Sequence, residues 1–138
     1  VGGYPDNSWI GDWYMWMALT KSGGKIKTIP DVLAKYRYHS ANSSKNKVKM
    51  FEARKHVLGF FKNSPLYGIA MAQGCVWAAR DFCYISKSMS AGCLLQSFQC
   101  TKKVVFHGFF YVALSGLFVP AWLARRIPFY VKRFPNLY

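Results

Sequence analysis

The sequence predicts an α/β chain that is mostly helical, with two or three short strands in its first third and membrane-associated helices at its end. Apolar residues recur at helical spacing over residues 10–19, 50–61 and 66–85. Residues 25–40 instead alternate in polarity with the two-residue period of strands. Residues 104–124 are nearly continuous apolar sequence, and a run of about 20 such residues is long enough to cross a hydrocarbon core.

The chain is strongly basic and strongly apolar at once. Its 138 residues include 19 Lys or Arg against 5 Asp or Glu, and 52% of them are hydrophobic. This apolar content excludes a disordered basic tail. The combination suits a partner that is both anionic and apolar, such as a phospholipid surface. No RNA- or DNA-binding motif accompanies the charge, so we expect no nucleic acid among the partners.

The first helix is expected to begin near Ser8, which can cap it, and to end at Gly23-Gly24. Asp12 then lies in the first turn, where the helix dipole favours a carboxylate. That charge alone explains an Asp at this position, so a purely structural role stays open. The apolar positions of the helix are Ile10, Trp13, Trp16 and Met17.

The alternating segment is divided by Pro30-Asp31 into two short extended pieces. In the second piece a period of two places basic side chains on one face and apolar or aromatic ones on the other. The basic face holds Lys35, Arg37 and His39, and the opposite face holds Ala34, Tyr36 and Tyr38. Three basic groups are therefore expected to converge on one side.

The rest of the chain is expected to be helical. An amphipathic helix starts near Lys47, a second apolar helix covers residues 66–85, and residues 86–92 form a loop. The run over 104–124 predicts membrane contact, by a spanning helix or by one lying in the interface, with a buried core helix as the alternative. The tail over 125–135 alternates cations with aromatic residues, which suits an anionic lipid surface.

Four cysteines form no CxxC pair and have no histidine at zinc-finger spacing. They are Cys75, Cys83, Cys93 and Cys100. We expect reduced, buried thiols in a cytoplasmic setting.

The stretch GGYPDNSWIGDWYMWMALTKSGGKIKTIPDVLAKYRYHSANSS resembles the C-terminal part of the catalytic domain of family 2 glycosyltransferases, which have the GT-A fold. The order of motifs carries the resemblance: a Gly-Gly-aromatic turn, an acid at a helix start, a glycine stop, and an extended YR-x-H-x-x-N-x-S segment. The matching residues are Gly2-Gly3-Tyr4, Asp12-Trp13, Trp16, Leu19, Gly23-Gly24, 26–30, Leu33-Ala34, Tyr36-Arg37, His39, Asn42 and Ser44. The family has a pair of acids where this chain has Gly11 and Asp12, so the first acid is missing.

We expect three parts: residues 1–45, which the resemblance implies are the C-terminal segment of the catalytic domain, then 46–100 as a helical extension and 101–138 as the apolar membrane-associated region. The chain begins at Val1 in what reads as mid-domain sequence, so we expect a fragment. A nucleotide-binding half carrying an Asp-rich motif would precede it. The fragment without that half is expected to be inactive.

The resemblance also implies the roles of individual residues. Asp12 would be the catalytic base, partly desolvated by the tryptophans around it. These tryptophans, Trp9, Trp13 and Trp16, would bind the acceptor or stack on the apolar face of a sugar. Arg37 and His39 would hold the donor diphosphate, and His39 is also a candidate metal ligand. The structural alternatives are a loop-capping His39 and a solvated Lys35.

The implied reaction transfers a sugar from a nucleotide-diphospho-sugar to an acceptor hydroxyl, with inversion, in polysaccharide or glycoconjugate synthesis. The implied cofactor is a divalent metal, Mg or Mn, bound mainly by the missing N-terminal half. The expected partners are the donor, a polysaccharide or lipid-linked acceptor, and the cytoplasmic face of a membrane. The alternative function is a non-enzymatic basic module that binds membrane surfaces or acts as an adaptor.

Overall fold

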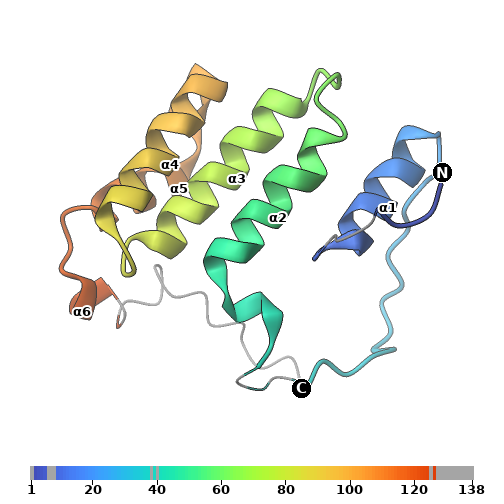
Figure 1. Cartoon of the computed structure of the whole chain (residues 1–138), viewed down its shortest axis with the longest axis horizontal. Helices are drawn as coiled ribbons and strands as arrows, with labels where there is room; N and C mark the ends of the chain where they lie inside the picture. Colours follow the sequence, from blue (N-terminus) through green and yellow to red (C-terminus); the bar gives the residue numbers. More distant parts are fainter. Residues whose placement is uncertain (1, 6–8, 38, 40, 125, 127–138) are drawn as a thin grey trace. The chain divides into compact units, whose positions relative to one another are not determined.

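The structure is a computed structural model and describes residues 2–5, 9–37, 39, 41–124 and 126. The chain divides into two compact units, Val1–Phe61 and Lys62–Tyr138. In the described residues, unit 1 contains two α-helices and a 3₁₀ turn, and unit 2 contains the remaining helices (Figure 1). The elements of unit 1 are α1 (Gly11–Lys21), η1 (Ser43–Lys45) and α2 (Lys47–Gly59). Those of unit 2 are α3 (Tyr67–Phe82), α4 (Lys87–Cys100), η2 (Lys102–Phe106), α5 (Gly108–Gly116) and α6 (Ala121–Ala124).

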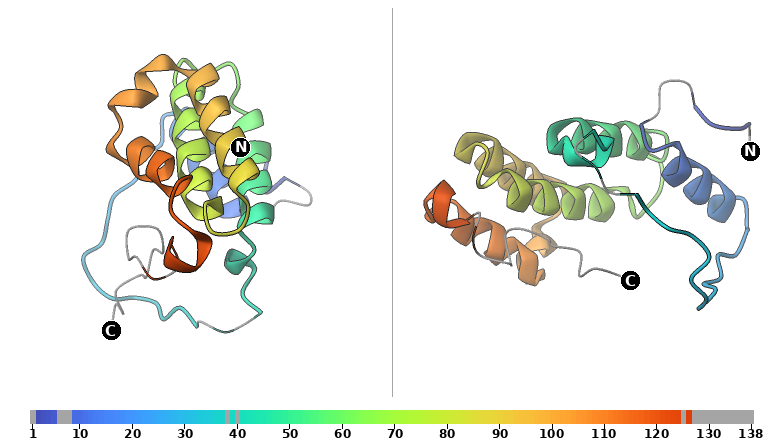
Figure 2. Two further views of the ribbon diagram at one scale, coloured as in Figure 1. Left: turned by 90° about the vertical axis from the view of Figure 1, so that its left-hand side faces the viewer. Right: turned by 90° about the horizontal axis from the view of Figure 1, so that it is seen from below.

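The predicted α/β fold is wrong for the described residues, which form helices and no strand. The segment after α1 runs without regular structure and is drawn as an open trace in Figures 1 and 2. Its aliphatic residues stay exposed, and Val32 is 90% exposed. A strand is stabilised by the ladder of a neighbouring strand. No second strand is available to this segment within the described chain, so its alternating pattern produces no sheet.

Unit 1 is held together by the packing of α1 against α2. Ile10, Val57 and Phe61 form its buried centre, and Val57 is fully buried. Around this centre pack six partly buried residues: Trp13, Tyr14, Met17, Ala18, Met50 and Ala53. Helix α2 begins at the predicted Lys47, where the side chain of Asn46 accepts a hydrogen bond from the Lys49 amide at 3.0 Å.

The end of α1 explains the two glycines after it. Gly23 has a positive φ of 92°, which favours glycine. The Gly23 amide donates to the Thr20 carbonyl at 3.1 Å, and the Gly24 amide donates to the Leu19 carbonyl at 2.8 Å. These two bonds are those of a Schellman motif. A Cβ on Gly24 would lie 2.7 Å from the Leu19 carbonyl oxygen, so this position also requires glycine. The predicted glycine stop is confirmed; the predicted cap, Ser8, lies outside the described residues.

Unit 2 is built on the pair of helices α3 and α4, with α5 packed beside them (Figure 2). The loop predicted over 86–92 is wrong, because α4 begins at Lys87 and Ser86 caps it by accepting from the Met89 amide. Ser90 is fully buried in the contact, and its hydroxyl donates to the Ala79 carbonyl of α3 at 2.8 Å. The Lys87 ammonium donates to the carbonyl of Gly116, the last residue of α5, and to that of Val119 in the link to α6.

The apolar run over 104–124 is divided among η2, α5 and α6. Breaks fall at His107, before α5, and at Pro120, before α6. As a result, no helix in the described part of the chain has the length and apolar character needed to cross a bilayer. The prediction of membrane-associated helices over residues 101–138 is therefore not confirmed, because the described part of this region forms short helices. The basic aromatic tail lies outside the described residues, apart from Arg126.

The cysteines are free, as expected from their spacing. Cys75, Cys83 and Cys93 are buried and Cys100 is partly buried. Burial raises the pKa of Cys83 and of Cys100, because a thiolate is poorly solvated inside the helical unit. For Cys83 the positive charge of Lys87 partly opposes this rise. These thiols serve as small packing residues.

The α3–α4 contact predicts a graded response at Ser90. Ser90→Ala should lower the free energy of unfolding by about 1 kcal/mol, since the Ala79 carbonyl keeps its bond from the Cys83 amide. Ser90→Leu should cost more, about 2–3 kcal/mol, because the larger side chain overpacks the contact. Urea unfolding followed by circular dichroism measures both. The control is Leu95→Ala, on an exposed part of α4, which should change the free energy of unfolding little. If Leu95→Ala lowered the free energy of unfolding as much as Ser90→Leu, the packing described here would be contradicted.

Candidate functional site

Asp12 lies in the first turn of α1 and its side chain is exposed. Among the residues that the structure describes, its carboxylate makes no hydrogen bond and no ion pair. The N-cap position is Ile10, and no side chain caps the helix there. The expected partial desolvation of Asp12 is therefore wrong, since the carboxylate faces solvent.

The helical repeat separates Asp12 from the packed face of α1. Successive residues turn by about 100° around the axis. Tyr14 and Ala18 lie on roughly the opposite side from Asp12 and pack toward α2. Trp16, one turn after Asp12, shares its side of the helix and is 51% exposed. Asp12 and Trp16 are thus the carboxylate and the aromatic ring that α1 presents together to solvent.

The three candidate stacking residues differ in their surroundings. The Lys49 ammonium lies 4.8 Å from the ring centroid of Trp9, and the Arg54 guanidinium lies 5.4 Å from that of Trp13. Both cations come from α2, so these rings already have a cation–π partner. Trp13 also packs against the unit 1 core. No ring or cation contact of Trp16 involves a described residue, which makes it the best placed of the three to stack on a ligand.

The space beside Gly11, which stands where the family pattern has its first acid, is filled by an aromatic ring. A Cβ on Gly11 would lie 2.8 Å from Cδ1 of Tyr4 and 3.6 Å from its Cε1. The Tyr4 ring therefore rests where a side chain at position 11 would begin. Gly2 and Gly3, just before it, both have positive φ, at 79° and 81°. The glycine turn thus leads into Tyr4, whose ring lies against Gly11 at the start of α1. Gly11 directly precedes Asp12 in the sequence.

Arg37 and His39 belong to the open segment after α1, and both are exposed. Their side chains make no hydrogen bond or ion pair with any described residue. The same holds for Asp12, so the structure does not join the candidate base to the candidate diphosphate ligands. Figures 1 and 2 show the segment after Gly24 leading away from α1. Lys35 is exposed as well, and Tyr38 of the opposite face lies outside the described residues.

A hydrogen-bonded cluster at the end of this segment was missed as a structural unit. The Asn42 side chain contacts the backbone at Arg37 and at His39, and it also contacts the hydroxyl of Tyr36. Tyr36 in turn shares a hydrogen bond with Ser44. The sequence signal was present, since Asn42 and Ser44 match the family pattern. Their spacing alone, however, does not say what these polar side chains bind.

The described residues do not make a metal site by themselves. They contain no group of three or more His, Cys, Asp or Glu side chains close enough to hold an ion. His39 offers a single imidazole, which fits one ligand of a shared site and not a complete one. The other histidines have packing neighbours: His56 meets Phe60 edge-on at 5.1 Å, and His107 lies 5.7 Å from Phe109.

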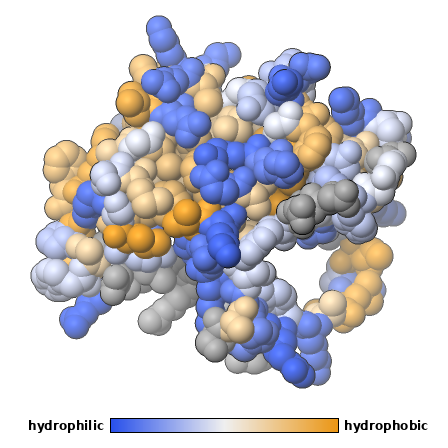
Figure 3. Space-filling view, viewed as in Figure 1, coloured by the Kyte–Doolittle hydropathy of each residue, from blue (hydrophilic) through white to orange (hydrophobic). Residues whose placement is uncertain are grey.

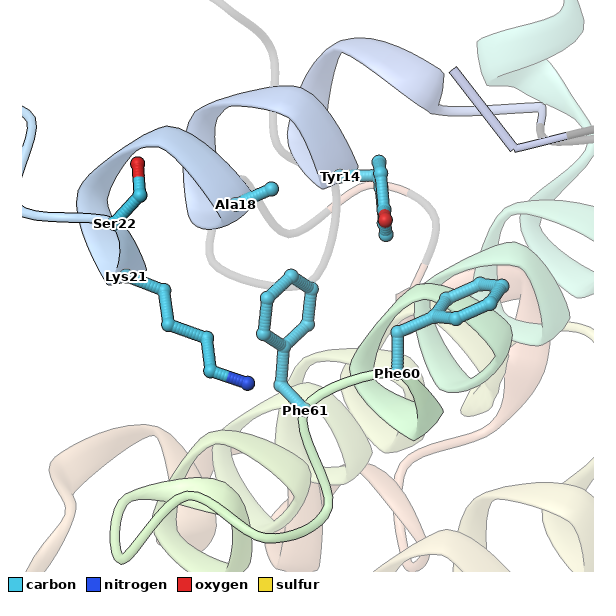
Figure 4. A pocket seen from close by; sticks show the side chains of 6 residues that line it. All are labelled: Tyr14, Ala18, Lys21, Ser22, Phe60 and Phe61. Carbon is cyan, nitrogen blue, oxygen red and sulfur yellow. The ribbon is translucent and has the colours of Figure 1, made fainter. Parts of the chain in front are cut away.

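A cavity of about 430 Å³ lies between α1 and the end of α2 (Figure 4). Its lining residues are Tyr14, Ala18, Lys21, Ser22, Phe60 and Phe61. The Tyr14 ring meets Phe60 edge-on at 5.1 Å, and the Lys21 ammonium lies 5.6 Å from the centre of the Phe61 ring. Its lining residues from α1 lie on the side of the helix that is turned away from Asp12. It is therefore separate from the candidate base.

Comparisons with known proteins do not decide the family. No protein-family model, curated protein or solved structure matches the chain. The assignment of roles therefore depends on the motifs and on the geometry described above.

The different surroundings of two tryptophans predict different responses to truncation. Trp13→Ala should lower the free energy of unfolding by about 1–3 kcal/mol, because the ring packs against the core of unit 1. Trp16→Ala should change it by less than about 0.5 kcal/mol, because that ring is half exposed. Denaturant unfolding followed by circular dichroism measures both. Equal losses for the two variants would contradict the placement of Trp16 outside the core.

Proposed function

We propose that the chain supplies the catalytic base of a glycosyltransferase that moves a sugar from a nucleotide-diphospho-sugar to an acceptor hydroxyl. The observation that carries the proposal is the carboxylate of Asp12, which is exposed on the unpacked side of α1 and makes no bond to a described residue. The order of motifs from Gly2-Gly3 to Ser44 adds support through its resemblance to family 2 glycosyltransferases.

In the proposed reaction Asp12 takes the proton of the acceptor hydroxyl while the hydroxyl oxygen attacks the anomeric carbon. The new carbon–oxygen bond forms as the bond from that carbon to the diphosphate breaks. The electron pair of the broken bond leaves with the nucleoside diphosphate. A single displacement of this kind inverts the configuration at the anomeric carbon. The acceptor in this proposal is a polysaccharide or lipid-linked hydroxyl, with Trp16 stacking on its sugar.

The leaving diphosphate needs positive charge, and the basic segment supplies candidates. The Arg37 guanidinium can hold two phosphate oxygens in a planar fork, and the His39 imidazole can donate to a third. Both side chains are exposed and unbonded within the described chain. A divalent Mg or Mn ion, when bound, would neutralise further phosphate charge. Its other ligands would come from a donor-binding half outside these residues, with His39 as at most one contributor.

Replacing the base tests this proposal directly. In the full-length protein, Asp12→Asn should lower the turnover number for sugar transfer by at least about 100-fold, because an amide cannot accept the hydroxyl proton. Nucleoside diphosphate binding, measured by isothermal titration calorimetry, should stay unchanged, since the base acts on the acceptor. Asp31→Asn is the control, an exposed carboxylate outside α1. Near-normal transfer by Asp12→Asn would contradict the assignment and leave Asp12 as a helix-end charge.

A second candidate function is binding to the anionic phospholipid of a cytoplasmic membrane face. It is favoured by large apolar side chains that unit 2 leaves in solvent: Phe106 is 89% exposed, Phe118 83% and Trp122 65%. Two exposed cations, Lys102 and Lys103, shortly precede Phe106 in the sequence. Figure 3 shows apolar and hydrophilic residues next to one another on the surface. Side chains of this kind can enter the boundary between headgroups and acyl chains without crossing the bilayer.

Vesicle sedimentation tests the second function. The protein should bind vesicles of phosphatidylcholine and phosphatidylglycerol better than vesicles of phosphatidylcholine. Replacing Phe106 and Phe118 together by Ser should weaken binding at least about tenfold, because two apolar insertions are lost. The matched control replaces Leu95 and Phe98, two exposed apolar residues of α4, by Ser. If both double variants bind like the original protein, these side chains do not contact lipid.

A further inference from the structure

The side chain of Asn42 uses both ends of its amide to hold the backbone of the basic segment. Its Nδ2 donates to the Arg37 carbonyl at 3.0 Å, and its Oδ1 accepts from the His39 amide at 3.2 Å. These two groups flank residue 38. The backbone N–H of Asn42 also donates to the His39 carbonyl at 3.2 Å. One residue therefore bonds to the backbone of both Arg37 and His39.

A second layer of bonds holds Asn42 in turn. The Asn42 Nδ2 donates to the Tyr36 hydroxyl at 2.9 Å, and that hydroxyl lies 3.1 Å from the hydroxyl of Ser44. Bonds from Ser44 and Asn42 lower the pKa of Tyr36, which fits an oxygen that receives hydrogen bonds. Asn42 and Ser44 are both partly buried, although their neighbours in the segment are exposed. The cluster thus adds side-chain hydrogen bonds to a segment that has no regular structure.

The cluster leaves the basic side chains themselves unused. Neither the Arg37 guanidinium nor the His39 imidazole takes part in its bonds, which involve the backbone of these residues only. The backbone of both residues is hydrogen-bonded to Asn42, while both cations stay exposed to solvent. Groups that are held before a ligand arrives lose less conformational freedom on binding. An arrangement of this kind favours a ligand with two adjacent negative groups.

We propose that Asn42 is a positioning residue that presets Arg37 and His39 for a diphosphate. The inference rests on the proposed function, since the donor of that reaction carries the diphosphate. The alternative use of Asn42 is glycosylation, because Asn42-Ser43-Ser44 fits the acceptor sequon. Glycosylation would need the Nδ2 atom, and this atom already donates to two oxygens. The hydrogen bonds therefore favour the positioning role.

Two variants separate the two ends of the amide. Asn42→Ala removes all the hydrogen bonds that the Asn42 side chain makes to Arg37, His39 and Tyr36. Asn42→Asp keeps an acceptor for the His39 amide but loses the donors to Arg37 and Tyr36, and it adds a negative charge beside the basic groups. The matched control is Asn46→Ala, which removes the cap of α2 and touches neither Arg37 nor His39.

The probe is inorganic pyrophosphate, titrated into the full-length protein by isothermal titration calorimetry. Asn42→Ala should weaken its binding about tenfold, a loss of about 1.4 kcal/mol. Asn42→Asp should weaken it further, because the added carboxylate repels the anion. Asn46→Ala should leave it unchanged. Hydrogen exchange at the His39 amide provides the local readout: it should speed up in Asn42→Ala and keep its rate in Asn46→Ala.

The outcomes distinguish this inference from the proposed function. Faster exchange at His39 with unchanged pyrophosphate affinity in Asn42→Ala would overturn the positioning role and leave the transferase proposal in place. Failure of the original protein to bind pyrophosphate would overturn both the positioning role and the donor role of Arg37. Weaker pyrophosphate binding by Asn42→Ala, combined with normal sugar transfer by Asp12→Asn, would support the positioning role and reject Asp12 as the base.

Discussion

The contact of Ile10 with Val57 and Phe61 holds α1 on α2, and it decides where the side chains of α1 point. Because these residues form the core of unit 1, the side of α1 that carries Tyr14 and Ala18 must face α2. Asp12 is then directed outward by the helical repeat. The exposure of the candidate base is therefore a consequence of packing elsewhere on the same helix. Its availability to a substrate comes from the same packing.

The basic segment is ordered by a different kind of interaction. It buries almost no apolar surface, and its aliphatic residues are exposed. Its order depends on the hydrogen bonds of one half-buried amide, that of Asn42. Hydrogen bonds in a solvent-accessible site stabilise only modestly. The two halves of the candidate site thus differ in stability: the helix that carries Asp12 is fixed by a core, and the segment that carries Arg37 and His39 is fixed by a few polar contacts.

Local patterns predicted much of the helical structure. The periodicity of apolar residues placed α1, α2 and α3, and Gly23-Gly24 placed the end of α1, because helix periodicity and helix termination are decided by near neighbours in sequence. The start of α4 was missed: its serines suggested a loop, but Ser86 caps the helix and Ser90 is buried against Ala79. That contact joins two different helices, α3 and α4. The amino-acid composition of residues 86–92 alone does not reveal this contact.

The sequence predicted which residues belong to the candidate site, but it did not predict how these residues are arranged in space. Asp12, Arg37 and His39 follow from motif order, whereas the cations of α2 that cover Trp9 and Trp13 belong to a different helix. The Tyr4 ring over Gly11 is likewise a tertiary contact. The strand prediction failed for a related reason, since alternation describes one strand and a sheet needs its neighbours.

The most direct test of the central claim is an experimental structure of the full-length protein with a bound nucleoside diphosphate and an acceptor sugar. We predict that the Arg37 guanidinium and the His39 imidazole contact the phosphate oxygens. The Asp12 carboxylate should lie within about 3 Å of an acceptor hydroxyl. A diphosphate bound away from Arg37 and His39, or an Asp12 covered by another part of the protein, would contradict the account.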